Sequence, residues 1–330
     1  MRPTLLVPVL SFLVSSACGG SGGDDGGPTG GGVQPTIPPA RSGHAMAYDP
    51  VRRVVLMFGG SGSATFGDLW SWNGTRWTRL AASGAQPSAR DDAILVFDDT
   101  RQRLVLFGGR SGQTLLSDTW EWDGSAWSQK TGTGPEARLH AVGAFDAQRS
   151  VVRIYGGVGS DDVPRTDTWE WNGTTWSRVS TAGPADQGAN QMAYDAGRQR
   201  TMLSLFARTQ PNADRTYPSG LWEWNGSAWA AVAGAGPMFS PVQPMTTLGA
   251  AGGLLLVDGG ALQGTFSTWA WQNGAWSRVS TAGPSLRNGH AVAYDAARNR
   301  VVLFGGFRSG QDFNDTWEWN GSAWTQVTPQ

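Results

Sequence analysis

One pattern of spaced tryptophans occurs six times along the chain and uses all 18 tryptophans of the sequence. Each copy has two tryptophans separated by one residue, and a third one follows five residues after the second. The copies are Trp70/Trp72/Trp77, Trp120/Trp122/Trp127, Trp169/Trp171/Trp176, Trp222/Trp224/Trp229, Trp269/Trp271/Trp276 and Trp317/Trp319/Trp324. A repeat of about 46 to 53 residues indicates an architecture built from identical supersecondary units rather than one irregular domain.

Each unit is expected to form four antiparallel strands, named a to d. In the first unit the sequence predicts strands over 44–48, 54–58, 69–72 and 75–80. Strand b is a continuous apolar run, which indicates burial on both faces. A glycine pair such as Gly59-Gly60 ends this strand, and only the fourth unit lacks the pair, with Phe206-Ala207 instead. Asn73-Gly74 between strands c and d is a strong hairpin signal.

The predicted two-residue turn at Asn73-Gly74 fixes a register in which Trp72 faces Thr75 and Trp70 faces Trp77. Side chains alternate along a strand, so Trp70, Trp72 and Trp77 are expected on one face of the hairpin. A single unit cannot bury such a face. We therefore expect neighbouring units to stack on one another in an array.

These residues resemble the Kelch repeat. Arg41-x-x-His44, Gly59-Gly60, Asp68-x-Trp70 and Trp77 are similar to its consensus, and Arg287-x-x-His290 with Asp315-x-Trp317 repeats it. The resemblance covers about residues 41–330 and implies an all-β, six-bladed β-propeller of four-stranded antiparallel Kelch-like blades, with strand a nearest the axis. The expected blades are 41–87, 88–135, 136–184, 185–237, 238–284 and 285–330. No strand is left over to join the last blade to the first, and only residues 33–38 are a candidate for that role.

The N-terminal residues are expected to direct export. Residues 1–17 are interpreted as a signal peptide, because their apolar stretch is too short to span a bilayer. Small residues precede Cys18, the only cysteine, and resemble a bacterial lipoprotein cleavage site. Lipidation of Cys18 is expected, with anchoring at the bacterial outer membrane or cell surface; since Ser15 replaces the usual Leu, ordinary signal-peptide cleavage is the alternative. Residues 18–40, rich in Gly and Pro, are expected to be a tether.

Composition and motifs argue against several functions. The formal net charge is −1 with both signs interspersed, so no nucleic-acid partner is expected. Copper radical oxidases similar to galactose oxidase also have Kelch-like propellers, but the only cysteine here lies in the export segment. His44, His140 and His290 recur near the start of strand a and are interpreted as structural. We expect no metal, no cofactor and no catalytic residues.

Ligand binding is expected on the face that carries the b–c and d–a loops, because these loops are long and differ between units. The candidate residues on this face are Arg110, Asp161, Asp162, Arg165, Arg208, Asp214, Arg215, Tyr217, Phe307, Arg308, Asp312 and Phe313. Four arginines, Arg41, Arg90, Arg138 and Arg287, recur nearer the axis. They could read an anion, or each could bond carbonyls or an acid in the scaffold; the repetition favours the structural role without excluding the other.

The function expected from the sequence is that of a non-enzymatic, surface-tethered binding module that recognises a protein or a carbohydrate. One alternative is a carbohydrate-active enzyme that uses carboxylates such as Asp91-Asp92 in the central cleft. Another is a structural component of the cell envelope. Propellers host many functions, so the fold does not decide among the three.

Overall fold

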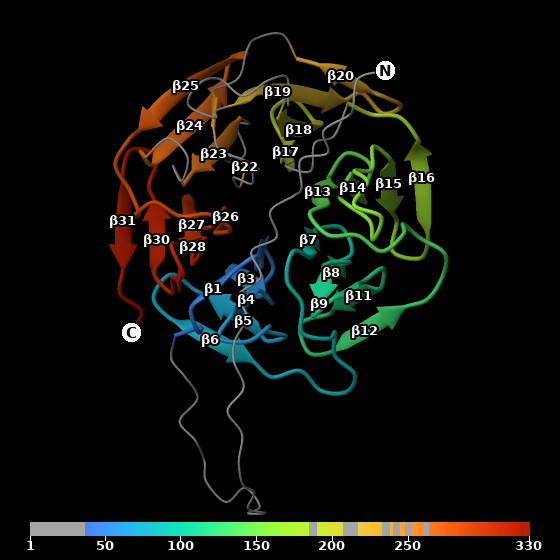
Figure 1. Ribbon diagram of the computed structural model, residues 1–330, viewed down its shortest axis with the longest axis horizontal. Coiled ribbons are helices and arrows are strands. Elements are labelled where there is room, and N and C mark those ends of the chain that lie inside the picture. Colours follow the sequence, from blue (N-terminus) through green and yellow to red (C-terminus); the bar gives the residue numbers. More distant parts are fainter. Residues whose placement is uncertain are drawn as a thin grey trace, which may run out of the picture. The chain divides into compact units, whose positions relative to one another are not determined.

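Six antiparallel sheets follow one another along the chain in the computed structural model, which describes residues 37–184, 190–206, 217–232, 238–239, 245–247, 253–259 and 264–330. Within each sheet the four main strands lie in chain order, from strand a to strand d. Figure 1 shows the sheets as blades around a common axis, with the strands d at the periphery and the last blade beside the first. This is the all-β, six-bladed β-propeller that the sequence predicts.

The blades have closely similar strands. Blade 1 consists of β2 (Ala45–Asp49), β3 (Val54–Phe58), β5 (Leu69–Trp72) and β6 (Trp77–Leu80), and blade 2 of β7 (Ile94–Asp98), β8 (Arg103–Phe107), β11 (Thr119–Trp122) and β12 (Trp127–Lys130). Blade 3 consists of β13 (Val142–Asp146), β14 (Val151–Tyr155), β15 (Thr168–Trp171) and β16 (Trp176–Ser180). Blade 4 consists of β17 (Asn190–Asp195), β18 (Arg200–Phe206), β19 (Tyr217–Trp224) and β20 (Trp229–Ala231). Blade 5 consists of β22 (Met245–Thr247), β23 (Leu254–Asp258), β24 (Ser267–Gln272) and β25 (Ala275–Ser280), and blade 6 of β26 (Ala291–Asp295), β27 (Arg300–Phe304), β30 (Thr316–Trp319) and β31 (Trp324–Val327).

Short strand pairs extend some of the blades. The b–c loops of blades 2 and 6 form small hairpins, and the segment before blade 1 pairs with its b–c loop. These pairs are β9 (Arg110–Ser111) with β10 (Thr114–Leu115), β28 (Phe307–Arg308) with β29 (Gln311–Asp312), and β1 (Arg41–Ser42) with β4 (Ser61–Gly62). The strand β21 (Met238–Phe239), expected at the start of blade 5, pairs with β19 of blade 4.

The register of the c–d hairpins differs from the sequence prediction. In blade 1, Trp72 pairs directly with Trp77, so the loop has four residues, Asn73 to Arg76, instead of two. The Asn73 side chain explains the longer loop, because its Oδ1 accepts hydrogen bonds from the backbone N of Thr75 and Arg76, both at 3.0 Å. The shift is two residues, so all three tryptophans still share one face. Only blade 5 has the two-residue loop, at Asn273-Gly274.

The tryptophan face of each blade packs against the blade before it. Trp70, Trp72 and Trp77 of blade 1 are at most 3% exposed and share one core cluster with Val302 and Phe304 of blade 6. The other blades form equivalent clusters, for example Trp120, Trp122 and Trp127 of blade 2 with Leu56 and Phe58 of blade 1. Burial of one large side chain contributes about 2–3 kcal/mol. The core therefore lies between blades, as the sequence predicts.

Hydrogen bonds also join neighbouring blades, as at the junction between blades 2 and 3. The indole Nε1 of Trp176 donates to the Thr119 hydroxyl of the preceding blade at 2.8 Å, and the Nε1 of Trp171 donates to Glu121 at 2.8 Å. Backbone bonds continue the junction near the axis, where the N of Gly109 donates to the carbonyl of Arg138 in the next blade at 3.0 Å.

Within the described residues the ring closes through this repeated junction, and no strand there is shared between blades 6 and 1. Blade 6 is completed by its own β31. Between blades 6 and 1, Trp77 donates to Thr316 at 2.9 Å and Trp72 donates to Glu318 at 2.9 Å, which reproduces the bonds between blades 2 and 3. The N of Gly306 donates to the carbonyl of Arg41 at 2.9 Å. The candidate staple, residues 33–38, lies mostly outside the described residues.

The glycine pairs after strand b are required by this close approach. Gly59 and Gly60 have φ of 73° and 98°, in the left-handed region that favours glycine. A Cβ on Gly60 would lie 2.8 Å from the Cβ of His44. The glycines thus let the blade approach strand a and the Arg90 backbone, whose carbonyl accepts the hydrogen bond of the Gly60 N.

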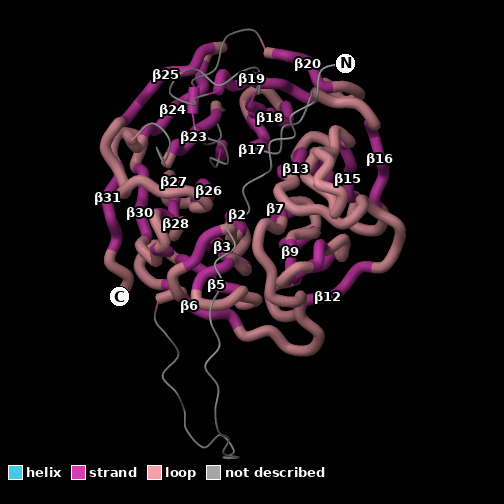
Figure 2. The backbone as a smooth tube through the Cα atoms, viewed as in Figure 1, coloured by secondary structure: helices cyan, strands magenta, loops and turns pink. Residues whose placement is uncertain are grey.

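Figure 2 shows that strands and loops make up the described chain. No helix in the described ranges is long and apolar enough to cross a membrane. The predicted signal peptide (residues 1–17), Cys18 and most of the predicted tether (residues 18–40) lie outside the described residues.

The junction between blades 1 and 2 lacks the glutamate acceptor found at other junctions, which generates a prediction. The buried Nε1 of Trp122 has no partner, and the position that holds Glu318 in blade 6 and Glu121 in blade 2 is Ser71 in blade 1. Ser71→Glu should give Trp122 an acceptor, with Arg52 placed to pair with it as Arg298 pairs with Glu318. We expect the free energy of unfolding, measured by urea titration, to rise by about 1 kcal/mol.

The control is the same substitution in a Trp122→Phe background, where no indole N–H remains to be satisfied. There the gain should vanish. An equal gain in both backgrounds would contradict the explanation.

Candidate functional site

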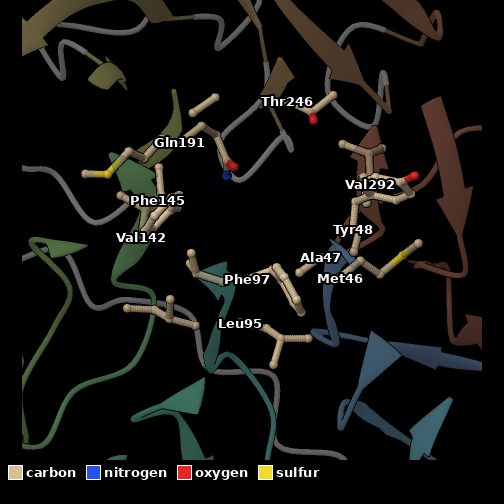
Figure 3. Close-up of a pocket in the computed structure, with 18 of the residues that line it drawn as sticks. Met46, Ala47, Tyr48, Leu95, Phe97, Val142, Phe145, Gln191, Thr246 and Val292 are labelled. Atoms are coloured by element: carbon tan, nitrogen blue, oxygen red, sulfur yellow. The ribbon is translucent and has the colours of Figure 1, made fainter. Parts of the chain in front are cut away.

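A cavity of about 620 Å³ follows the propeller axis, a size that fits a small ligand or the end of a chain. Strand a of all six blades contributes to its wall. The middle of the wall is mostly apolar, with Leu95, Val142 and Val292 among its side chains (Figure 3). One end lies at the loop face, which carries the b–c and d–a loops, and the other lies at the turn face, which carries the a–b and c–d turns.

The loop-face mouth is formed by the residue two positions after the recurring arginine, where the blades differ. Blades 1 and 6 have Gly43 and Gly289, with φ of 63° and 62°. Blades 2 and 3 have Asp92 and His140 in the same left-handed conformation, with φ of 53° and 57°. Such a conformation costs a non-glycine residue about 1 kcal/mol or more. Two polar side chains thus replace the residue that the backbone favours.

Asp92 and His140 interact across the junction between blades 2 and 3. The Nε2 of His140 lies 3.3 Å from the Oδ2 of Asp92, and both side chains are partly exposed, at 38% and 23%. Backbone bonds extend the contact around the axis, because the N of Asp92 donates to the Gly43 carbonyl at 2.8 Å and the N of Gly43 to the Gly289 carbonyl at 2.9 Å. The pair therefore sits in a partial ring of bonds at the cavity entrance.

The electrostatics of the mouth favour a charged pair. Burial alone would lower the pKa of His140, but the hydrogen bond and negative charge of Asp92 outweigh it and raise this pKa above its ordinary value. Beside the pair, Arg110 donates to both carboxylate oxygens of Asp91, at 3.2 and 3.0 Å. The Arg110 side chain remains 41% exposed. The mouth thus offers hydrogen-bond donors and acceptors to a ligand.

The four recurring arginines are part of the scaffold. Arg41 is fully buried and donates to both oxygens of Asp68 at 2.7 and 3.1 Å, to the Gly59 carbonyl at 2.9 Å and to the Pro39 carbonyl at 3.1 Å. The pairs Arg90–Asp118, Arg138–Asp167 and Arg287–Asp315 repeat this geometry. Although burial alone would raise the pKa of Asp68, bonds and charge from Arg41 keep it below its ordinary value. Because the guanidinium groups of all four arginines are buried, they are not available to a ligand.

The other sequence candidates on the loop face are spread over several blades. Arg165 pairs with Asp161 at 3.1 Å and with Glu136 at 3.3 Å, and Asp162 is exposed. In blade 6, Phe307 and Arg308 are exposed, Asp312 accepts a bond from the Ser42 hydroxyl at 3.0 Å, and the Phe313 ring lies under Arg287. Arg208, Asp214 and Arg215 lie outside the described residues, and Tyr217 is placed only as the first residue of β19. The structure does not gather these residues into one site.

Sequence reasoning missed the role of His140. It grouped this residue with His44 and His290, which are buried, have pKa values lowered to about 3 by burial first of all, and pack between blades. His140 instead occupies the Gly43 position. The signal was present in the spacing, since His140 follows Arg138 by two residues and His44 follows Arg41 by three. In the described residues no cluster of three or more metal-ligating side chains occurs.

Comparison with known proteins shows what shares this repeat. The family model described as the KLHDC2/KLHL20/DRC7 Kelch-repeats domain matches residues 32–203. Among solved structures, that of YjhT is similar with a TM-score of 0.66 and 16% sequence identity, over 89% of this chain and 99% of that chain. At this identity the similarity concerns the fold alone. No curated protein sequence matches the chain significantly.

The buried arginines generate a stability prediction. Arg90→Ala leaves Asp118 and the Gly108 carbonyl without their shared donor, so the free energy of unfolding should fall by about 3 kcal/mol. Thermal and urea unfolding measure the loss. Arg308→Ala on the same face, where the side chain is exposed, should leave the melting temperature unchanged. Unchanged stability of Arg90→Ala would contradict the structural role.

The mouth generates a pH prediction. The pKa of His140 is raised in the folded state, so its pairing with Asp92 should stabilise the fold. This stabilisation should be complete at pH values below the pKa of histidine in the unfolded chain, which is near 6.5. The contribution should disappear as pH rises through the folded value. Asp92→Asn should lower the pKa of His140 in an NMR titration and cost more stability at pH 5.5 than at pH 8.5. An equal loss of stability at both pH values would contradict the pairing of His140 with Asp92.

Proposed function

We propose that this chain, which belongs to the KLHDC2/KLHL20/DRC7 Kelch-repeat domain family, is a non-enzymatic binding module that takes its ligand at the loop-face mouth of the axial cavity. The observation that carries the proposal is the presence of Asp92 and His140, in a left-handed conformation, at the position where blades 1 and 6 have Gly43 and Gly289. In a repeat protein the common residues build the scaffold, and a departure that costs backbone strain needs another reason to be kept. Contact with a ligand is such a reason.

The chemistry of the mouth fits a carbohydrate best. The carboxylate of Asp92 accepts hydrogen bonds from hydroxyl groups, and the exposed Arg110 and His140 donate to ring and hydroxyl oxygens. Behind these groups the wall becomes apolar, with Ala93, Ala141 and Ile94 lining the cavity, and can contact the carbon-bound hydrogens of a sugar. A protein ligand would have to insert a loop or a chain end, because the site is concave.

Export and lipid anchoring remain part of the proposal. The sequence Ser15-Ser16-Ala17-Cys18 supports cleavage before a lipidated cysteine, and the Gly-rich residues that follow would tether the propeller to a membrane. Metabolic labelling with a radioactive fatty acid tests this, with Cys18→Ser as the variant that should lose the label. If the wild-type protein takes up no label, ordinary signal-peptide cleavage is favoured instead.

Glycine variants test the binding function without disturbing the fold. Asp92→Gly and His140→Gly install the residue that Gly43 and Gly289 provide, so stability should stay within about 1 kcal/mol of wild type. Binding to glycans, first found on an array and then titrated by calorimetry, should weaken about tenfold or more in each variant. The matched control is Gln102→Gly, another left-handed residue, which lies in an a–b turn at the turn face.

Three outcomes would contradict the proposal. Glycan binding that the glycine variants leave intact would place the site elsewhere. Turnover of a polysaccharide by wild type, lost in Asp92→Gly, would favour the carbohydrate-active enzyme. No ligand among glycans and envelope extracts would favour a structural envelope component.

A further inference from the structure

The turn-face end of the axial cavity is lined by aromatic side chains at one register position. Five blades place an aromatic residue just before the aspartate that ends strand a, and all five line the cavity. These residues, called here the aromatic collar, are Tyr48, Phe97, Phe145, Tyr194 and Tyr294. In blade 5 the strand pairing puts Thr247 at this position. Figure 3 shows Tyr48, Phe97 and Phe145 around the opening.

Two of the three collar tyrosines bond to the turns through their hydroxyls. The Tyr48 hydroxyl accepts a hydrogen bond from the N of Ala297 in blade 6 at 3.1 Å. The Tyr294 hydroxyl donates to the Oδ1 of Asn299 at 2.9 Å. These bonds orient the two rings, and the ring carbons remain to line the cavity.

A single charged residue stands at the rim of the collar. Two residues after each collar residue the described blades have Pro50, Asp99, Ala147, Ala196 and Ala296, and all five line the cavity. Blade 2 alone in this set has a carboxylate there. The nearby carboxylates of Asp49 and Asp98 are already paired, with Arg52 at 2.7 Å and Arg101 at 2.8 Å. No ion pair involves Asp99 within the described part of the chain.

We infer that the turn-face mouth is a second ligand site, distinct from the loop-face mouth, and that it binds an organic cation such as a quaternary or primary ammonium group. Aromatic rings attract a cation through their negative faces, and several rings around one opening form a cage for it. Asp99 supplies the opposite charge. A neutral ligand would gain no charge attraction from that carboxylate, and an anion would be repelled by it.

The charge balance at the rim supports the same ligand class. Desolvation first, and then the negative charges of Asp98 and Asp49, raise the pKa of Asp99 to about 6. No positive group contributes to this shift, although Arg52 and Arg101 lie nearby on their own aspartates. A bound cation would relieve the repulsion among the three carboxylates. The ionised form of Asp99 should therefore bind more tightly than the protonated form.

Choline and its neutral isostere 3,3-dimethylbutan-1-ol are the probes that separate charge from shape. Choline should bind wild type in an NMR or calorimetric titration, and the neutral isostere should bind at least about fivefold more weakly. Choline affinity should rise as pH increases through about 6. Asp99→Asn should weaken choline binding about fivefold and abolish the pH dependence.

The matched control is Asp123→Asn, which removes a negative charge from the c–d turn of the same blade and installs the residue found at Asn73. It should leave choline binding unchanged. Phe145→Leu keeps apolar volume and loses the aromatic ring. It should weaken the binding of choline and leave the binding of the isostere unchanged. Choline binding that equals that of the isostere, or that survives Asp99→Asn, would overturn the inference, as would no binding at millimolar choline.

This inference stands apart from the proposed function. Asp92→Gly, at the loop-face mouth, should leave choline binding intact, and Asp99→Asn should leave glycan binding intact. Each site can therefore fail its own test without affecting the other.

Discussion

The packing of each tryptophan face on the preceding blade is the interaction on which the propeller depends. One four-stranded blade leaves Trp70, Trp72 and Trp77 with no partner of its own, and blade 6 buries them almost completely. The indole N–H groups then bond Thr316 and Glu318 of that blade. Since every blade needs its predecessor, the arrangement is satisfied only when the last blade also precedes the first, which is what a closed ring provides.

The repeat also supplies a baseline against which individual residues can be judged. The arginine–aspartate pairs and buried histidines recur with the scaffold, whereas Asp92, His140 and Asp99 interrupt it. Asp92 and His140 replace glycine in a left-handed conformation, and Asp99 replaces alanine or proline at a rim. All three line the axial cavity, so these departures from the repeat coincide with a feature that can hold a ligand.

Much of the fold was predictable from the sequence, because apolar runs and tryptophan spacing report burial directly. Strands b and c of blade 1 have the predicted bounds, and the six blades follow the six tryptophan triplets. The predicted c–d register is wrong, because an Asn-Gly pair predicts a two-residue turn; the Asn73 side chain instead accepts hydrogen bonds from two backbone N–H groups and makes a longer loop. Site prediction was poorer. Arg90 and Arg138 are paired inside the blades, and only the folded structure places His140 of blade 3 beside Asp92 of blade 2.

Hydrogen exchange of the indole N–H groups tests the closure of the ring most directly. Trp72 and Trp77 span the junction between blades 6 and 1, and Trp171 and Trp176 span the covalently continuous junction between blades 2 and 3. If these two junctions are equivalent, the four indoles should be protected to a similar extent and should exchange together. Rapid exchange confined to Trp72 and Trp77 would show that the ring opens where the chain is not continuous, and would contradict closure by blade packing alone.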